Sequence, residues 1–153
     1  MTSLENRIPP PLVAVIAAAG IWWLSTCTST LALISTVKYS LVFGFSLAGL
    51  FFALSGAISF RLAKTTVNPL KPETASALVT SGIYQYTRNP MYVGFVAFLF
   101  AWVSFLGSVW GVGLIALYIA YIQRFQITPE ERALTKIFKG EFIDYKAQVR
   151  AWL

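Results

Sequence analysis

The sequence predicts an all-α, polytopic helical membrane protein with four transmembrane helices, a cytoplasmic loop and a C-terminal amphipathic helix. Of its 153 residues, 57% are hydrophobic and only 12% are charged, whereas about a quarter of the residues in a soluble domain are charged. Three stretches contain no charged residue: 8–37, 39–60 and 89–123. Each is long enough to cross a bilayer, which takes about 20 apolar helical residues. The length suits a single domain, residues 1–153.

The first charge-free stretch predicts a span over residues 10–26. Residues 9–11 are all proline, which suits a helix start because the missing N–H leaves no helical hydrogen bond unmade there. A cleaved signal peptide is the alternative, because Arg7 precedes an apolar run that ends at Cys27 in a sequence resembling a lipoprotein cleavage box. Thr26 departs from that box, which favours a retained span.

The second charge-free stretch predicts a span over residues 40–60. It contains Gly44, Gly49 and Gly56, and small residues of this kind let membrane helices approach one another closely. We therefore expect these glycines to lie at helix contacts.

The third charge-free stretch is too long for one crossing. A helix of about 35 residues would extend about 52 Å, whereas the hydrocarbon core is about 30 Å thick. Clusters of lysine and arginine precede and follow the stretch, and basic residues mark the cytoplasmic side, so the number of crossings must be even. The natural break at Gly107 and Ser108 predicts two spans, over residues 91–106 and 109–124.

Four such spans place all of the 12 lysines and arginines except Lys38 on one side of the membrane. By the positive-inside rule this side is the cytoplasm. Both termini and the polar segments 61–90 and 124–153 are expected there, with the protein in the plasma or inner membrane. The basic excess follows the ends of the spans and forms no separate basic domain, so nucleic acid is not an expected partner.

A cytoplasmic helix is expected to begin at Thr128. Thr128 suits an N-cap, Pro129 the first helical position and Glu131 the third, which together form a capping box. The apolar residues that follow recur at intervals of three and four, as in an amphipathic helix lying on the membrane or on the neighbouring loop: Leu134, Ile137, Phe138, Phe142, Tyr145, Val149 and Trp152. Gly140 is expected to bend or divide this helix.

The residue inventory excludes several kinds of active site. The sequence has no histidine, a single cysteine and six carboxylates. A Ser-His-Asp or Cys-His nucleophile, an internal disulfide and a histidine-bearing zinc site are therefore excluded, and no metal site is predicted. Nearly all charged side chains fall in segments 61–90 and 124–153, so an active site must be built from these two segments.

One motif in the first segment points to a family. Residues 78–94 read Leu-Val-Thr-x-Gly-x-Tyr-x-x-x-Arg-Asn-Pro-x-Tyr-x-Gly, and a Glu130-Glu131 pair and Tyr145 follow. This ordered set resembles the isoprenylcysteine carboxyl methyltransferase family, over residues 64–153. Membrane methyltransferases acting on phospholipid amines or small thiols share the core motif. The resemblance implies a membrane enzyme that uses S-adenosylmethionine, held between the loop and the glutamate-bearing segment, and a lipophilic or prenylated acceptor.

Carried over residue by residue, the resemblance implies a set of cofactor contacts: Ser76, Leu78, Val79, Tyr84, Asn89, Pro90, Tyr92 and Glu130. Eukaryotic members usually have histidine where this chain has Asn89 and Ser76. Asparagine donates and accepts hydrogen bonds but does not titrate near neutral pH. A mechanism that requires a histidine base is therefore not expected here.

The chemistry of methyl transfer agrees with this inventory. A carboxylate acceptor is already ionised at pH 7, so the reaction needs positioning more than acid or base catalysis. Glu130 and Glu131 can pair with a cationic cofactor, and tyrosine rings can add cation–π contact. Arg88 or Arg124 can orient the acceptor carboxylate. We therefore predict Arg88, Asn89 and Arg124 as catalytic residues and Glu131 as a further cofactor contact.

Other hypotheses stay open from the sequence. The acceptor can instead be a phospholipid amine or a small thiol, and a membrane reductase of the steroid-reductase type has a similar arginine-x-proline-x-tyrosine-x-glycine run. A non-enzymatic four-span protein is the remaining alternative, although ion-coupled transporters usually carry an ionisable residue within a span. Glu130 and Glu131 can also serve only the helix start, and Arg88 and Arg124 only as interfacial anchors.

Overall fold

The computed structural model describes residues 5–63 and 76–153, and within these the fold is entirely helical. Residues 64–75 of the predicted cytoplasmic loop lie outside the described residues. The helices are α1 (Pro10–Cys27), α2 (Ser35–Leu62), a short 3₁₀-helix η2 (Gly82–Gln85), α3 (Pro90–Leu106), α4 (Gly111–Ile122), a π-helical turn η3 (Gln123–Ile127), α5 (Thr128–Phe138) and α6 (Gly140–Gln148). The prediction of an all-α fold is confirmed.

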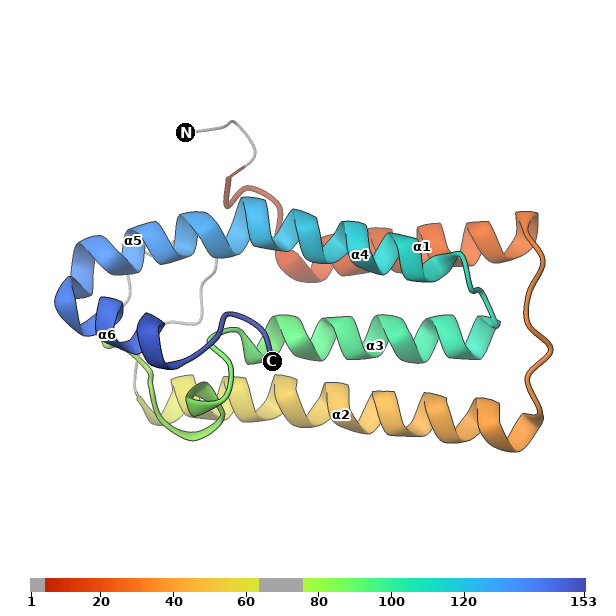
Figure 1. The fold of residues 1–153 in the computed structure, drawn as a ribbon, viewed down its shortest axis with the longest axis horizontal. Coiled ribbons are helices and arrows are strands. Elements are labelled where there is room, and N and C mark those ends of the chain that lie inside the picture. Colours follow the sequence, from red (N-terminus) through yellow and green to blue (C-terminus); the bar gives the residue numbers. More distant parts are fainter. Residues whose placement is uncertain (1–4, 64–75) are drawn as a thin grey trace.

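Helices α1 to α4 run lengthwise through an elongated molecule (Figure 1). Helix α3 lies between α2 and α4, and α1 lies beside α4. The connections 28–34 and 107–110 lie at one end, whereas η2, α5 and α6 gather at the other, which we call the polar end. The polar end therefore brings together the two segments that the sequence marks as the place for an active site.

The predicted spans correspond well to helices. Helices α1 and α2 are long and apolar enough to cross a membrane, and α3 is equally apolar but shorter. Helix α2 starts five residues before the predicted span 40–60 and ends two residues after it. The predicted break is confirmed, because α3 ends at Leu106 and is capped by Gly107, which has a left-handed φ of 66°. The Gly107 carbonyl accepts a 2.8 Å hydrogen bond from Leu31 N–H.

Two of the three glycines in α2 lie at helix contacts, as expected. A Cβ on Gly49 would come within 3.0 Å of the Gly94 carbonyl oxygen on α3, and one on Gly56 within 2.9 Å of the Met91 side chain. These positions need glycine because α2 and α3 approach so closely. For Gly44 the expectation is wrong, since nothing lies within 4 Å of its Cβ position.

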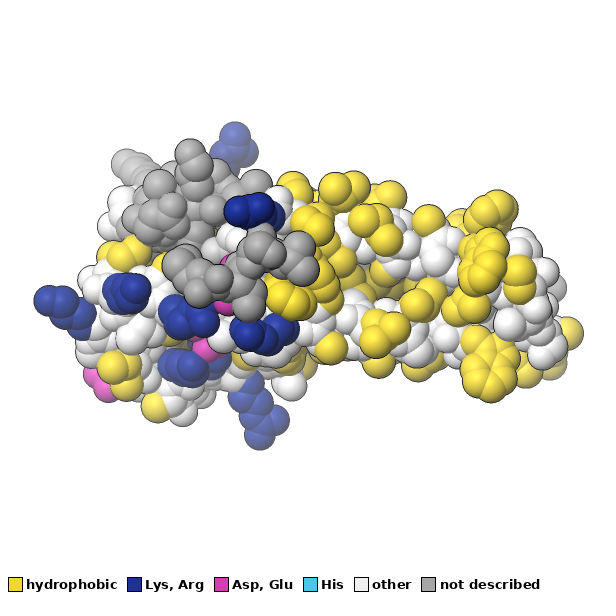
Figure 2. All heavy atoms as spheres, turned by 90° about the horizontal axis from the view of Figure 1, so that it is seen from above, with side chains coloured by type: hydrophobic (Ala, Val, Ile, Leu, Met, Phe, Trp, Pro, Cys, Tyr) yellow, Lys and Arg dark blue, Asp and Glu magenta, His cyan; other side chains and the backbone are white. Residues whose placement is uncertain are grey.

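The surface has the polarity of an integral membrane protein. Large apolar side chains on α1 and α2 point outward, with Trp23 60% and Phe43 70% exposed. On the face seen in Figure 2, the lysine, arginine and acidic side chains gather at one end, and the rest of that face is apolar or uncharged. Apolar side chains cover this much outer surface only where they meet lipid or another protein.

Helix α5 starts at Thr128 as expected, but the expected capping box is wrong. The backbone is helical through Gln123 and Ile127, so α4, η3 and α5 form one continuous helical rod. Thr128 therefore caps nothing: its hydroxyl donates a 2.7 Å hydrogen bond to the Gln123 carbonyl, five residues earlier. Pro129 has no N–H for the Phe125 carbonyl, which instead accepts a 3.1 Å hydrogen bond from Asn6 N–H.

The π-helical turn sets which side chains of the rod face α3. In a regular α-helix, residues 12 positions apart would lie about 120° apart around the axis. The turn takes up an extra residue, which keeps Tyr118, Ile122, Gln126 and Glu130 near one face. The first three of these side chains are at most 2% exposed. Glu130 is thereby directed inward toward Tyr92 of α3. Its sequence neighbour Glu131 pairs instead with Arg88 and Lys146.

The C-terminal helices pack on the loop rather than lying free. The rod breaks at Lys139, just before Gly140, as predicted. The apolar sides of α5 and α6 close a small core at the polar end, formed by Val79, Tyr84, Phe142 and Tyr145. The interpretation of these helices as resting on the neighbouring loop is therefore confirmed, and the loop residues 78–84 are fixed in place.

Candidate functional site

The loop residues and the C-terminal helices meet through hydrogen bonds as well as apolar contacts. Tyr145 on α6 donates a 2.6 Å hydrogen bond from its hydroxyl to the Tyr84 carbonyl. The ring of Tyr84 packs edge-on against Phe60 of α2, with 5.4 Å between ring centroids. Burial raises the pKa of Tyr145 to about 12. Both tyrosines are therefore neutral at physiological pH and hold the loop against α2 and α6.

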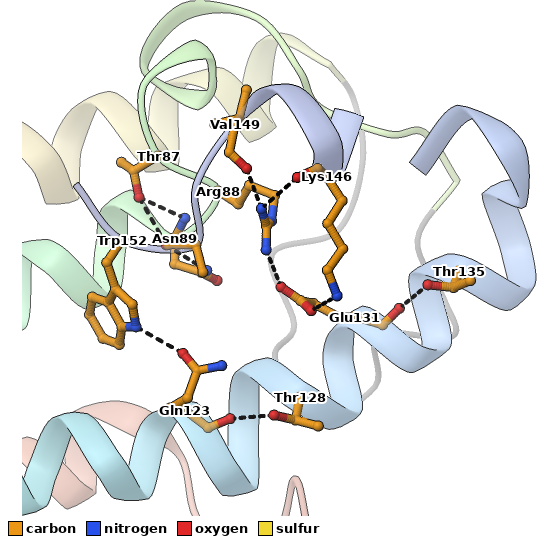
Figure 3. A network of polar contacts seen from close by, with 11 residues as sticks. Thr87, Arg88, Asn89, Gln123, Thr128, Glu131, Thr135, Lys146, Val149 and Trp152 are labelled. Atoms are coloured by element: carbon orange, nitrogen blue, oxygen red, sulfur yellow. Dashed lines mark hydrogen bonds and ion pairs between the residues drawn. The ribbon is translucent and has the colours of Figure 1, made fainter. Parts of the chain in front are cut away.

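Arg88 is the centre of a network that joins three segments (Figure 3). Its guanidinium forms an ion pair with Glu131 on α5 and donates to the backbone carbonyls of Val149 and, at 3.3 Å, Lys146. The backbone N–H of Arg88 donates a 2.9 Å hydrogen bond to the Arg150 carbonyl. The side chains of Arg88 and Glu131 are only 9% and 15% exposed, so this pair is largely shielded from water.

Glu131 has cations on both carboxylate oxygens. One oxygen pairs with Arg88, and the other with Nζ of Lys146 at 2.5 Å. Partial burial acts to raise the pKa of Glu131, but the hydrogen bonds and charges of Lys146 and Arg88 outweigh it, so the pKa lies below its ordinary value. Glu131 is therefore ionised, and both of its oxygens are already paired with side chains within the protein.

Residues 149–152, which follow α6, form a strap across the start of α3 (Figure 3). The Ala151 carbonyl accepts hydrogen bonds from the Asn89 side-chain amide at 2.9 Å and the Thr87 hydroxyl at 3.1 Å. Trp152 donates from its indole N–H to the Gln123 side-chain oxygen at 2.8 Å. Asn89 stands at the N-cap of α3 but makes no side-chain cap bond, because its amide is directed to the strap.

Glu130 has surroundings quite different from those of Glu131. Its carboxylate accepts a hydrogen bond of 3.2 Å from the Tyr92 hydroxyl, at the first turn of α3. The residue keeps some accessible surface, but its carboxyl group is deeply enclosed. Burial of that group raises the pKa of Glu130 to about 7, although the Tyr92 hydrogen bond acts to lower it. Burial raises the pKa of Tyr84, and the negative charge of the Glu130 carboxylate raises it further.

The remaining predicted residues lie in different surroundings. Val79 and Pro90 are buried, Leu78 is half-buried, and Ser76 is exposed at the edge of the described region. Arg124 is exposed on the side where the N-terminal segment runs, with Glu5 at 3.7 Å and the Phe125 ring at 5.8 Å. The structure thus brings Tyr84, Arg88, Asn89, Tyr92 and the two glutamates to one end of the bundle, and it pairs Arg124 with Glu5.

Several residues of this arrangement were not predicted from sequence. Thr87, Gln123, Lys146 and Trp152 contribute side chains to the network and strap through partners distant in sequence, and no spacing in the chain indicates them. Tyr118 faces the same buried cluster as Tyr92, and its hydroxyl has no hydrogen-bond partner among the described residues. No group of His, Cys, Asp or Glu in the described part of the chain is arranged to hold a metal ion.

Comparison with known proteins places the chain in a family. The family model described as phospholipid methyltransferase matches residues 37–141. The protein-S-isoprenylcysteine O-methyltransferase of Schizosaccharomyces pombe is 35% identical over 72 residues, which is 47% of this chain but only 30% of that protein. An uncharacterized protein of Haemophilus influenzae is 41% identical over 64 residues, 41% of this chain and all of that protein. No solved structure matches. The chain belongs to the phospholipid methyltransferase family.

Proposed function

We propose that this protein is an integral membrane methyltransferase that uses S-adenosylmethionine to methylate a nucleophile at the polar end of a lipophilic acceptor. Family membership supports the reaction class. The observation that carries the cofactor assignment is the contact between Tyr92 at the start of α3 and the enclosed carboxylate of Glu130 on α5.

The surroundings of Glu130 fit a cationic cofactor. A carboxylate taken out of water is costly unless a positive charge or several hydrogen bonds compensate it. Among the described residues, one tyrosine hydroxyl is the hydrogen-bond partner of Glu130. The raised pKa of Glu130, about 7, expresses this deficit. A sulfonium beside the carboxylate would supply the missing charge, and the rings of Tyr84 and Tyr92 would add cation–π attraction.

The neighbouring residues divide into contact and positioning roles. S-adenosylmethionine supplies an electrophilic methyl group that needs no acid or base to become reactive. Ser76, Leu78, Val79, Pro90 and Asn89 are proposed to line its binding site, as the family motif implies. Because Glu131 is already paired with Arg88 and Lys146, we assign it a positioning role: it fixes the start of α5, and thereby Glu130, against α3.

The leading acceptor is a carboxylate of the isoprenylcysteine type. Arg88 is tied to Glu131, but its Nε–H is buried without a partner among the described residues, and this donor is available to orient an anionic oxygen. The similarity to the S. pombe enzyme supports the same choice. A phospholipid amine is the second candidate, supported by the description of the family. A nicotinamide-dependent reductase and a non-enzymatic protein have no comparable support.

The proposed membrane arrangement has four crossings, formed by α1, α2, α3 and the rod that begins with α4. The polar end, which holds the strap and all described carboxylates, faces the cytoplasm by the positive-inside rule. The cofactor would then enter from the cytoplasm, and the acceptor would reach the site from the bilayer.

Cofactor binding is tested by calorimetry on the purified protein in detergent. We expect S-adenosylmethionine to bind wild type, and Glu130→Gln and Tyr92→Phe to weaken it. Glu141→Gln is the matched control, because Glu141 is an exposed glutamate on α6. Absence of binding to wild type, or wild-type affinity in both variants, would contradict the proposal.

The acceptor is identified by offering the protein S-farnesylated cysteine or phosphatidylethanolamine together with methyl-labelled cofactor. A methyl ester loses its label as methanol in base, whereas an N-methylated lipid retains it. Label that base releases from the farnesylated cysteine is the result we expect. Label retained in phosphatidylethanolamine would transfer the assignment to the amine.

A further inference from the structure

The opposite end of the bundle carries a groove that the proposed reaction does not use. It lies between the first half of α2 and the second half of α3, with a volume of about 300 Å³, and it is lined by Val42, Ser46, Phe98, Ala101, Trp102 and Phe105. Small side chains at Ser46 and Ala101 leave space between three large aromatic rings. Along α3, Phe105 lies 13 residues beyond Tyr92, which is about 20 Å of helix.

The walls of the groove are aromatic and firmly held. Trp102 donates its indole N–H to the Ala18 carbonyl of α1 at 3.0 Å, so its polar group is satisfied away from the groove. Its ring stacks on Phe105, with 5.6 Å between centroids. The groove therefore presents a largely apolar surface around the anchored ring of Trp102, which suits a hydrocarbon chain.

A single cation stands at the mouth of the groove. Lys38 lies one helical turn before Val42 on α2, and its Nζ is 4.9 Å from the centroid of the Phe105 ring. The ion pairs found among the described residues all lie at the polar end, and none includes Lys38. A cation whose neighbour is an aromatic ring, without a carboxylate, attracts an anion from its surroundings.

Exposed aromatic residues indicate that this end reaches the level of lipid headgroups. Tyr39, next to Lys38, is 60% exposed, and Trp110, just before α4, is 64% exposed. Tyrosine and tryptophan are enriched where the bilayer meets water. Lys38 would thus lie at headgroup depth while the groove extends into the hydrocarbon region.

We propose that the groove binds one acyl chain of an anionic phospholipid of the bilayer, whose phosphate pairs with Nζ of Lys38. The site lies in the leaflet opposite the methyl-transfer site and takes a lipid that is not methylated. It does not depend on the proposed activity, so neither conclusion falls with the other.

The site is tested by native mass spectrometry of the purified protein titrated with phosphatidylglycerol, which is anionic, or phosphatidylcholine, which is zwitterionic. Wild type is expected to retain one phosphatidylglycerol about fivefold more strongly, the effect of one lysine near a membrane surface. Lys38→Gln should reduce this preference to about one. Lys136→Gln, which removes an exposed lysine at the polar end, should leave it unchanged.

Two further variants test the groove itself. Ala101→Phe and Ser46→Phe fill it from α3 and from α2, and each is expected to reduce retention of both lipids severalfold. The second variant keeps the test decisive if the first fails to fold. An undiminished preference in Lys38→Gln, or wild-type lipid retention in a folded groove variant, would overturn the proposal. So would a lipid-free dimer, which would assign the face to a second copy of the chain.

Discussion

Two adjacent glutamates at the polar end have opposite surroundings. Glu131 pairs with Arg88 and Lys146, and its pKa is lowered. In the described part of the chain, Glu130 has one tyrosine hydroxyl as its hydrogen-bond partner, and burial raises its pKa to about 7. Removing one partner of a shielded ion pair leaves an uncompensated charge, and an uncompensated buried carboxylate costs free energy. We therefore infer that the Glu131 region holds the structure together and that the Glu130 region takes a cationic ligand.

The largest loss of stability is expected when the ion pair of Glu131 with Arg88 is removed. Arg88→Ala would remove the ion pair and the donors to the Val149 and Lys146 carbonyls. Removing one partner of a shielded pair costs about 3 to 5 kcal/mol. Thermal unfolding in detergent should show a clearly lower midpoint, with α6 and the strap loosened. A midpoint unchanged from wild type would show that the network does not support the fold.

Glu130→Gln is expected to stabilise the protein above neutral pH, whereas Arg88→Ala destabilises it. A carboxyl whose folded pKa is raised from 4.5 to about 7 contributes stability below pH 4.5, and this contribution is lost as the pH rises through 7. Glutamine keeps the acceptor for Tyr92 without the charge, so at pH 8 the variant should be more stable by up to about 3 kcal/mol.

The control for this prediction is the same pair of proteins at pH 5. There Glu130 is protonated in the folded state, and the two thermal midpoints should nearly coincide. A variant that is less stable than wild type at pH 8 would mean that the carboxylate of Glu130 is structural, as that of Glu131 is.

A smaller effect is expected from loosening the strap. Trp152→Phe would keep an aromatic ring but remove the hydrogen bond to Gln123, which is worth about 1 kcal/mol. The thermal midpoint should fall slightly, and hydrogen exchange at residues 149–151 should become faster. Unchanged exchange there would show that the indole N–H does not hold the strap.

The smallest effect is expected for Lys146→Gln. The side chain of Lys146 is 50% exposed, and exposed ion pairs contribute about 0–1 kcal/mol. Glu131 would keep Arg88, so both the unfolding midpoint and cofactor affinity should stay close to wild type. If Lys146→Gln lost as much stability as Arg88→Ala, the more exposed cation would contribute as much as the buried one, which would contradict this prediction.

The sequence predicts the helices better than it predicts their contacts. Charge-free stretches and the prolines before α1 and α3 locate these helices to within about two residues, because proline and charge act locally. The start of α5 at Thr128 is predicted, but the capping box is not formed, because the backbone is already helical before Thr128. The Phe125 carbonyl that Pro129 leaves unpaired accepts from Asn6, more than a hundred residues away. No local signal indicates a partner at that distance.

The candidate site shows the same limit. The motif marks Arg88, Asn89, Tyr92 and Glu130, and the structure brings them to one end of the bundle. The strap partners of Arg88 and Asn89 are the backbone carbonyls of Val149 and Ala151. Every residue has a carbonyl, so these partners leave no trace in the sequence. The difference between Glu130 and Glu131 depends on the π-helical turn, which the sequence pattern does not reveal.

The central claim is that the carboxylate of Glu130 binds the positive charge of the cofactor. It is tested by calorimetric titration with S-adenosylmethionine in buffers of different ionisation enthalpy, which counts the protons released on binding. With a pKa of about 7 that falls when the cation binds, wild type should release about half a proton at pH 7 and more at pH 6, whereas Glu130→Gln should release none. Binding to wild type without proton release, or equal release from the variant, would contradict the claim.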